Sequence, residues 1–264
     1  MKELFIRALS GLAYVAIILG SIHAGETSFY ALFFVLMLLC LYEFKRLIGL
    51  HYNWAYVVAA LIFIRFSELA IFQSKYFHFF LIISLFIPFI YQLFITKIRI
   101  ASSKIGHFFL AIAYIALPFS FMTSIPFIDG EYHPKTIMSI FVLIWANDTF
   151  AYITGTLFGK TKLYEKISPN KTVEGAIGGF LATVLAAYFL AQFVPILTLV
   201  SWLIIAALIA IFGMLGDLIE SKFKREAQVK DSSNLIPGHG GFLDRLDSVI
   251  FAAPFIYVYL HLFY

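Results

Sequence analysis

Charge is the scarcest property of this sequence, because only 13% of its 264 residues are charged, against about 25% in an average soluble domain. The single cysteine, Cys40, excludes an intrachain disulfide and a zinc site built from several cysteines. Low-complexity stretches and convincing internal repeats are also lacking, which weakens the case for a transporter built from duplicated halves. The chain is instead 62% apolar and 19% aromatic, a composition typical of a polytopic membrane protein.

Long apolar blocks predict the fold class, an all-α polytopic membrane protein with about nine transmembrane helices. Each helix must cross a hydrocarbon core of roughly 30 Å. The blocks cover residues 4–22, 29–42, 54–72, 76–95, 106–126, 137–158, 175–194, 197–220 and 248–263. The weakest is 54–72, where Arg65 and Glu68 can pair on one helix face. Glu3 and the poor small-residue site near Ala24 disfavour a cleaved signal peptide in the first block.

The distribution of lysine and arginine predicts the orientation of these helices. If the N-terminus is cytoplasmic, the cytoplasmic segments hold 16 of the 19 basic residues, leaving only Arg65, Lys75 and Lys135 on the far side. This bias fits the positive-inside rule with an odd number of spans, so the C-terminus is predicted on the far side. The net charge of +4 therefore needs no nucleic-acid partner. The compact chain favours a bacterial cytoplasmic membrane as its location.

Polar residues divide the chain into two regions. Residues 1–135 have little polar content inside their spans, and are predicted to serve mainly as a scaffold and a source of dimer contacts. Residues 136–264 are predicted to form the catalytic region, because they place ionisable groups within and beside spans. Asn147 and Asp148 lie inside one, where a charge costs several kcal/mol unless it is paired, hydrated or bound to a cation. The alternative is that both only bond a neighbouring helix.

The loop after this span is rich in lysine. Its start, "GTLFGKT" from Gly155 to Thr161, encloses three residues between glycines where the phosphate-binding loop needs four, so it is not a nucleotide motif. Lys171 comes just before a helix predicted to begin near Glu174, with Thr172 or a neighbour as its cap. Since a helix N-terminus favours anions, a ligand phosphate would explain a lysine there. A solvated lysine that sets the topology is the alternative.

Acids and bases gather again near the end of the chain. Asp217, Glu220 and Lys224 align on one helix face at the end of a span. The segment "PGHGG", Pro237 to Gly241, provides backbone flexibility and close approach of the chain. Magnesium prefers carboxylate and phosphate oxygens, and basic side chains neutralise the remaining phosphate charge. The residues therefore predict metal-dependent phosphate transfer to a lipid. His239 is predicted to donate a hydrogen bond to the substrate or to have a structural role. It is not predicted as a metal ligand, because no second histidine lies at ligand spacing.

One long motif resembles the signature of the phosphatidate cytidylyltransferases, also called CDP-diacylglycerol synthases. It reads Ser221-x-Phe223-Lys224-Arg225, four residues, Lys230-Asp231, and then Pro237-x-His239-Gly240-Gly241-x-x-Asp244-Arg245-x-Asp247. The blocks "NDTFAY", "SPNKTVEG" and "GDLIES" are also similar to family blocks, whereas the N-terminal half matches only in being hydrophobic and of suitable length.

The resemblance implies a magnesium-dependent reaction of CTP with phosphatidic acid, giving CDP-diacylglycerol and pyrophosphate. It also implies a homodimer in the lipid bilayer, with the active site facing the cytoplasm; a second cation is left open. On this basis the predicted metal ligands are Asp217 and Asp244. The predicted catalytic residues are Asp148, Lys171, Glu174, Glu220, Asp231 and Asp247. The predicted substrate-binding residues are Lys160, Lys224, Arg225, Lys230, His239 and Arg245.

Two other functions are considered. A CTP-dependent polyprenol or phytol kinase has a similar overall character, but should lack the full run from Lys230 to Asp247. A lipid or ion transporter would also use Asp148 inside a span, but it does not explain a signature concentrated on one face. A purely structural membrane protein is disfavoured, because buried ionisable groups are costly without a use.

Overall fold

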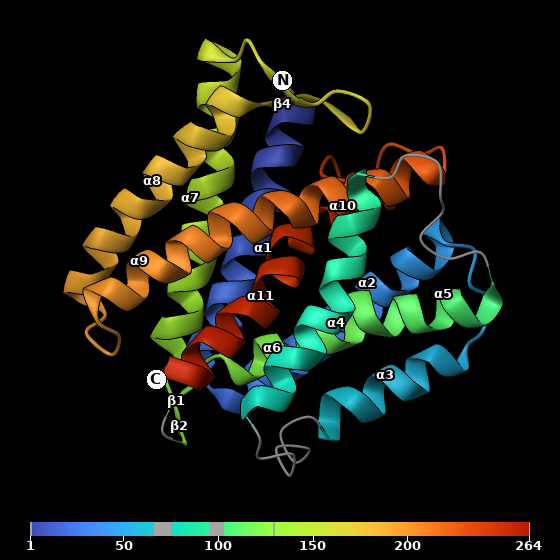
Figure 1. Cartoon of the computed structure of the whole chain (residues 1–264), viewed down its shortest axis with the longest axis horizontal. Coiled ribbons are helices and arrows are strands. Elements are labelled where there is room, and N and C mark those ends of the chain that lie inside the picture. The colour runs from blue at the N-terminus through green and yellow to red at the C-terminus, as the bar shows by residue number, and fades with distance from the viewer. Residues whose placement is uncertain (1, 66–74, 95–102, 129, 264) are drawn as a thin grey trace.

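The computed structural model describes residues 2–65, 75–94, 103–128 and 130–263, and most of them are helical (Figure 1). The first helices are α1 (Lys2–Ala24), α2 (Glu26–Leu47), α3 (Trp54–Arg65) and α4 (Lys75–Phe94). One continuous segment follows, made of α5 (Lys104–Ala111), the π-helical turn η2 (Ile112–Ala116) and α6 (Leu117–Ser124). The rest are α7 (Pro134–Phe158), α8 (Val173–Phe193), α9 (Leu199–Leu208), the π-helical turn η3 (Ile209–Gly213), α10 (Met214–Glu226) and α11 (Leu243–Phe263).

Seven helical segments in the described part of the chain are long and apolar enough to cross a membrane. Shorter apolar helices occupy Trp54–Ile64 in α3 and Ile82–Phe94 in α4. The predicted helical class is therefore confirmed, and the chain is an integral membrane protein. Each of the nine predicted blocks contains a helix, but nine crossings stay a prediction. Glu68, the predicted partner of Arg65, lies outside the described residues.

Two helix ends differ from the predicted blocks. The eighth block was expected to end at residue 220, but its helix continues to Glu226. Residues 221–226 contain no glycine or proline that would end the helix. The basic residues Lys224 and Arg225 also suit the negative end of a helix dipole. The last helix begins at Leu243 rather than near residue 248. The acids Asp244 and Asp247 therefore project from the first turns of α11 instead of from a loop.

Two short antiparallel hairpins add to the helices. β1 (Phe127–Ile128) pairs with β2 (Glu131–Tyr132) between α6 and α7. β3 (Lys162–Tyr164) pairs with β4 (Ser168–Thr172) between α7 and α8. The N-terminus and the β3–β4 hairpin lie at one end of the molecule, and the C-terminus and the β1–β2 hairpin lie at the opposite end (Figure 1). An odd number of crossings would produce this arrangement of the termini.

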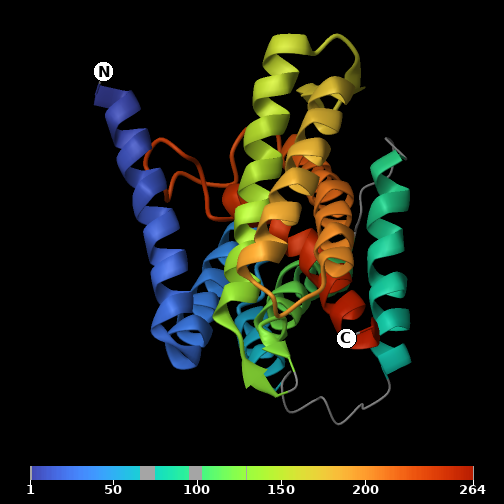
Figure 2. The same cartoon turned by 90° about the vertical axis from the view of Figure 1, so that its left-hand side faces the viewer.

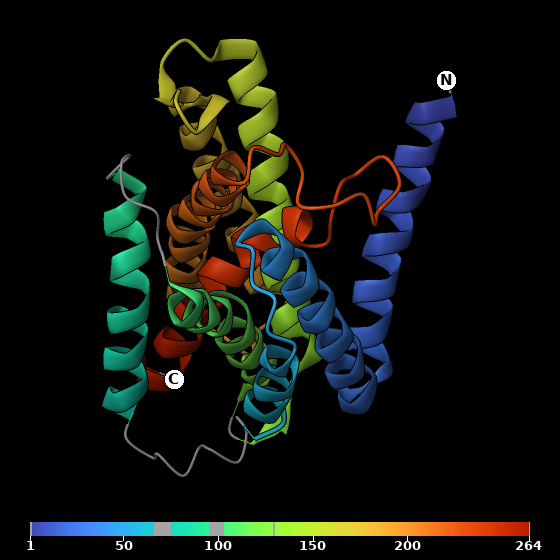
Figure 3. The same cartoon turned by 90° about the vertical axis from the view of Figure 1, so that its right-hand side faces the viewer.

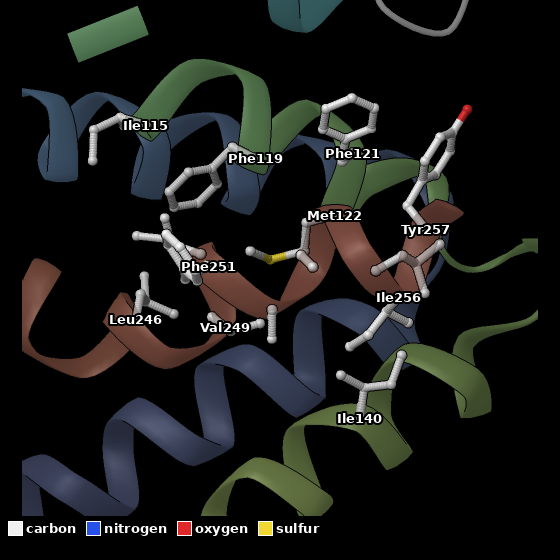
Figure 4. Close-up of a cluster of buried hydrophobic side chains, with 14 of the residues drawn as sticks. Ile115, Phe119, Phe121, Met122, Ile140, Leu246, Val249, Phe251, Ile256 and Tyr257 are labelled. Carbon is white, nitrogen blue, oxygen red and sulfur yellow. The ribbon is translucent and has the colours of Figure 1, made fainter. Parts of the chain in front are cut away.

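Helix α11 lies at the centre of the molecule. In its apolar 18-residue stretch 72% of the residues are buried, compared with 11% in the corresponding stretch of α1. It packs against α4, α6, η3 and α10, while α1 and α4 flank opposite sides of the molecule (Figures 2 and 3). Phe119 and Met122 of α6 meet Val249 and Phe251 of α11 in the hydrophobic core (Figure 4). This core fixes α11, and with it the acids of its first turns.

Candidate functional site

Helices α7 and α8 approach each other closely through glycine. A Cβ atom at Gly175 would lie 2.7 Å from the carbonyl oxygen of Ala151, and one at Gly179 would lie 2.8 Å from that of Asn147. The hydroxyl of Thr172 accepts a hydrogen bond from the backbone N–H of Gly175 at 3.1 Å, which confirms the predicted cap of this helix. The close packing brings β4 and the start of α8 against α7.

A cavity of about 610 Å³ opens between α7, β4, α8, η3, α10 and α11. Six of the predicted site residues line it, namely Asp148, Lys171, Asp217, Asp244, Arg245 and Asp247. They come from segments far apart in the sequence, since α7 and α11 are separated by more than half of the C-terminal region. The remaining predicted residues lie outside the lining of this cavity.

Three carboxyl groups meet at one point beside the cavity. Asp217, Glu220 and Asp247 each offer a carboxylate oxygen, and these oxygens lie within 4.8 Å of one another. In the described ranges, this is the set of acidic, histidine and cysteine side chains that could hold a metal ion. Glu220 is fully buried, and its Oε1 has no hydrogen-bond partner. A buried carboxylate oxygen without a donor is costly, so this acidic cluster fits a cation well.

Asp244 lines the same cavity but has other partners. Its Oδ1 accepts a hydrogen bond from Lys224 at 2.7 Å. Its Oδ2 accepts from the backbone N–H groups of Gly241 at 2.8 Å and Ser232 at 2.9 Å. Its assignment as a metal ligand stays a prediction. The carboxylates that cluster with Asp217 are instead those of Glu220 and Asp247, which were predicted as catalytic residues.

Two lysines neutralise part of this negative charge. Lys171, just before α8, forms an ion pair with Asp217. Lys224 forms ion pairs with both Glu220 and Asp244. Because Lys171 is only partly exposed and lines the cavity, the structure places it beside an acid rather than in open solvent. It can reach a ligand in the cavity if that contact changes.

The two predicted arginines have different surroundings. Arg245 lines the cavity, and its Nε and Nη2 donate to the carbonyl oxygen of His239 at 3.1 and 2.8 Å. Arg225 donates from Nε to Ile167 at 3.3 Å and from Nη1 to Val229 at 3.2 Å, both through carbonyl oxygens. Arg225 therefore holds the turn between β3 and β4, whereas Arg245 is available at the cavity.

Other predicted residues organise nearby loops. The carboxylate of Glu174 accepts hydrogen bonds from the backbone N–H groups of Lys160 at 3.1 Å and Thr161 at 3.1 and 3.2 Å. These bonds tie the loop after α7 to the first turn of α8. Lys230 and Asp231 are exposed in the segment between α10 and α11. Their predicted roles remain predictions.

His239 lies against the first helix rather than in the cavity lining. Its Nδ1 is 2.8 Å from the hydroxyl oxygen of Ser10, on α1. Burial and the nearby positive charges of Arg245 and Arg7 lower the pKa of His239. A neutral imidazole bonded to the first helix favours the structural alternative for this residue, and its role in substrate binding stays a prediction.

Asn147 and Asp148 both line the cavity but differ in their contacts. The side-chain oxygen of Asn147 accepts from Thr183 on α8 at 3.3 Å, and its nitrogen donates to Asp148 at 3.4 Å. Asn147 thus bonds a neighbouring helix, but it also lines the cavity, so the choice between a structural and a functional role stays open. Asp148 lines the cavity and is exposed to it, so it remains a candidate site residue.

Sequence reasoning missed Glu43, a fully buried acid near the end of α2. Its carboxylate accepts hydrogen bonds from the side chains of Ser232 and Ser233 at 2.9 and 2.6 Å. It also accepts from the backbone N–H groups of Phe242 and Leu243 at 3.0 and 2.8 Å. The signal in the sequence was a lone acid at the end of an apolar run. The basic residues that follow it made it look like part of a polar flank.

The sequence of this chain is also similar to those of known proteins. Residues 5–263 match the cytidylyltransferase family. The phosphatidate cytidylyltransferase of Bacillus subtilis (strain 168) is 44% identical over 171 residues, which are 64% of this chain and 63% of the relative. The Staphylococcus haemolyticus protein of that name is 39% identical over 167 residues, 63% of each chain. The Haemophilus influenzae protein of that name is 42% identical over 159 residues, 53% of this chain and 55% of the relative. The match therefore spans less than two thirds of each relative.

Proposed function

Because this chain belongs to the cytidylyltransferase family, we propose that it transfers the cytidylyl group of CTP to phosphatidic acid, giving CDP-diacylglycerol and pyrophosphate. The observation that carries the proposal is the cavity where Lys171 and Arg245 lie beside a cluster of three acids, two of them buried. A family relationship alone would leave open where the chemistry occurs. The cavity supplies a place with both positive groups for phosphates and oxygens for a cation.

The charge balance of the site supports a substrate that arrives with a cation. Five carboxyl groups, those of Asp148, Asp217, Glu220, Asp244 and Asp247, line the cavity or form the acidic cluster. Four basic groups, those of Lys162, Lys171, Lys224 and Arg245, line the cavity or pair with these acids. If all are ionised, an excess of negative charge remains, and it would repel a triphosphate. A divalent cation removes this repulsion.

We assign the cation to the acidic cluster of Asp217, Glu220 and Asp247, with magnesium as the ion. Magnesium prefers oxygen ligands and usually leaves several positions to water and phosphate. When bound, it would neutralise phosphate charge that develops during the transfer. Asp244 remains a further candidate ligand, and a second cation remains part of the proposal. Lys171, released from Asp217, and Arg245 would contact phosphate oxygens.

The reaction needs positioning more than proton transfer. A phosphate oxygen of phosphatidic acid forms a bond to the α-phosphorus of CTP, and the bond from that phosphorus to the bridging oxygen of the β-phosphate breaks. Pyrophosphate leaves with the bonding electron pair. The attacking oxygen is already anionic, so no strong general base is needed. The side chains of Lys171 and Arg245 then act by holding the two phosphate groups close together and reducing their mutual repulsion.

We also propose that the N-terminus and the cavity face the cytoplasm of a bacterial cell. The supporting observations are the distribution of basic residues and the bacterial source of the relatives. Cysteines introduced at Lys166, in the β3–β4 turn, and at Glu131, in the β1–β2 hairpin, test this orientation. In intact cells a membrane-impermeant maleimide should label Glu131→Cys and spare Lys166→Cys. The reverse pattern would invert the topology. The homodimer expected from the family resemblance is tested by the mass of the protein in detergent.

The reaction itself is tested with the purified full chain in detergent, given CTP and phosphatidic acid with and without magnesium. Pyrophosphate release that requires all three components, with CDP-diacylglycerol identified by mass spectrometry, is the expected result. A polyprenol kinase would instead release CDP and phosphorylate a polyprenol. A transporter would turn over neither substrate. Either of these outcomes would reject the proposed function.

A further inference from the structure

The buried carboxylate of Glu43 connects the N-terminal region to the segment between α10 and α11. Glu43 is 0% exposed, although it lies near the C-terminal end of a helix whose neighbouring residue Arg46 is exposed. All four of its hydrogen-bond donors come from residues 232–243, about 190 to 200 positions later in the chain. A buried charge persists only where donors compensate for lost hydration. The position of those donors is therefore coupled to Glu43.

Two of the donors are backbone groups at the start of α11. Phe242 donates to Oε1 at 3.0 Å, and Leu243 donates to Oε2 at 2.8 Å. N–H groups at a helix N-terminus lack partners within the helix, and the helix dipole there favours a negative charge. Gly241 permits the approach, because a Cβ atom there would lie 2.5 Å from Glu43 Oε2. Glu43 thus acts as a cap supplied by another helix.

The hydroxyl of Ser232 joins Glu43 to the cavity. Its Oγ lies 2.9 Å from Glu43 Oε2 and 2.9 Å from Asp244 Oδ2. A hydroxyl carries one hydrogen, so the two carboxylates share a single donor. The backbone N–H of Ser232 also donates to Asp244. Displacement of Ser232 would therefore remove both of its contacts with Asp244.

The connection continues to the acidic cluster. Asp244 accepts from Lys224, and Lys224 pairs with Glu220, whose carboxylate belongs to that cluster. The path from Glu43 through Ser232, Asp244 and Lys224 to Glu220 consists of direct polar contacts. We call this path the Glu43 network. It joins α2, the segment after α10, α11 and α10 itself.

We propose that Glu43 is a positioning residue for the reaction: through the Glu43 network it fixes Asp244 and Lys224, and thereby the geometry of the acidic cluster. This inference rests on the proposed function. It assigns a role in the reaction to a residue of the N-terminal region. Glu43 does not line the cavity, so its effect is exerted through the residues it holds.

The kinetic test compares Glu43→Gln with the matched control Glu26→Gln, an exposed acid at the other end of α2. Glutamine keeps the shape, but its NH₂ group cannot accept the backbone hydrogen bond. We expect kcat to fall about 10- to 100-fold, as for residues that orient metal ligands. The magnesium concentration for half-maximal activity should rise, while the KM for CTP changes little. Glu43→Asp, which keeps the charge, should recover part of kcat.

A Glu43→Gln variant that elutes as a folded protein with kcat and magnesium dependence within about twofold of wild type would overturn the proposal. If Glu43→Gln does not fold, Ser233→Ala removes only one of the hydrogen bonds to Glu43. We then expect kcat to fall about two- to tenfold, the worth of one hydrogen bond. An unchanged kcat and magnesium dependence in Ser233→Ala would overturn the proposal in the same way.

A second readout is independent of the reaction. Trypsin should cut after Lys230 faster in Glu43→Gln than in Glu26→Gln, because the segment that follows loses its contacts. Cleavage after Lys166, in the β3–β4 turn, serves as the internal reference, since this exposed residue lies outside the Glu43 network. Faster cleavage after Lys230 supports the positioning role, and an unchanged rate overturns it. If wild type releases no pyrophosphate, the proposed function fails, while the cleavage comparison still decides whether Glu43 holds the segment.

Discussion

The N-terminal and C-terminal regions differ in what their interiors contain. Among the described residues, four buried polar or charged side chains lie in residues 1–135, and twelve lie in residues 136–264. The first interior is built of aliphatic and aromatic side chains, as in the contact between Phe33 and Phe119, whose ring centroids are 6.5 Å apart. The second contains the cavity and the acidic cluster. Aromatic packing builds a rigid interior, whereas polar groups collect where a ligand can compensate for their burial.

Glu43 is the exception that refines this comparison. It is buried in the first region, but its hydrogen bonds are made to the second. Ser10, on α1, likewise contacts His239 and the carbonyl oxygen of Pro237. The division into a scaffold and a catalytic region stays a proposal. On our interpretation, the scaffold also holds the loop that carries the long sequence motif.

The largest difference in stability between variants of the two regions should follow from removing a lysine that pairs with buried acids. Lys224→Met leaves Glu220 and Asp244 without their shared lysine, so we expect destabilisation by about 3–5 kcal/mol. Lys135→Met, at an exposed position of the first region, is the control and should have little effect. Thermal unfolding in detergent measures both. Equal midpoints for the two variants would contradict the view that the buried Lys224 is structural while the exposed Lys135 is not.

A second prediction concerns activity without loss of the fold. Asp217→Asn removes one charge of the acidic cluster and the ion pair with Lys171, and we expect kcat to fall about 10²- to 10³-fold. Glu131→Gln, in the exposed β1–β2 hairpin, should retain wild-type activity. Pyrophosphate release at several magnesium concentrations provides the measurement. Substantial activity of Asp217→Asn at ordinary magnesium concentrations would remove Asp217 from the proposed metal site.

A third prediction compares glycines in the two regions. Gly175→Ala should destabilise the protein by about 1–3 kcal/mol, because the new Cβ atom would lie 2.7 Å from the carbonyl oxygen of Ala151. Gly20→Ala on α1 meets no atom within 4 Å and should be neutral or stabilising by up to about 1 kcal/mol. Thermal midpoints in the same detergent separate the two. A Gly175→Ala protein as stable as wild type would show that α7 and α8 can move apart freely.

The smallest effect should be a pH dependence of the contact between α1 and the loop. Since the pKa of His239 is lowered in the folded protein, the neutral imidazole stabilises the fold. This contribution is complete above the unfolded-state pKa of about 6.5 and is lost as the pH falls through the lower folded pKa. Wild type should therefore lose thermal stability on acidification more steeply than His239→Asn. Parallel losses in both proteins would exclude His239 as the titrating group.

Much of the fold could be predicted from sequence because its signals are local. Helical segments, the Thr172 cap and the alignment of Asp217 with Glu220 depend on neighbours within a few residues. The start of α11 could not be predicted from hydropathy, since charged residues occupy its first turns and its cap includes Glu43 from another helix. The grouping of Asp247 with Asp217 and Glu220 joins two helices and was likewise not predicted, while Asp244 as a metal ligand stays a prediction.

By itself, the sequence determined that this chain is a helical membrane protein and that residues 136–264 place ionisable groups within and beside their spans, because hydropathy and charge can be summed along a single segment. Only the tertiary structure decided which carboxyl groups cluster together and which accept hydrogen bonds from nearby donors. A carboxylate's environment depends on the groups around it, and those groups come from distant helices. The bond from Leu243 to Glu43 joins residues 200 positions apart, a contact that no local pattern specifies.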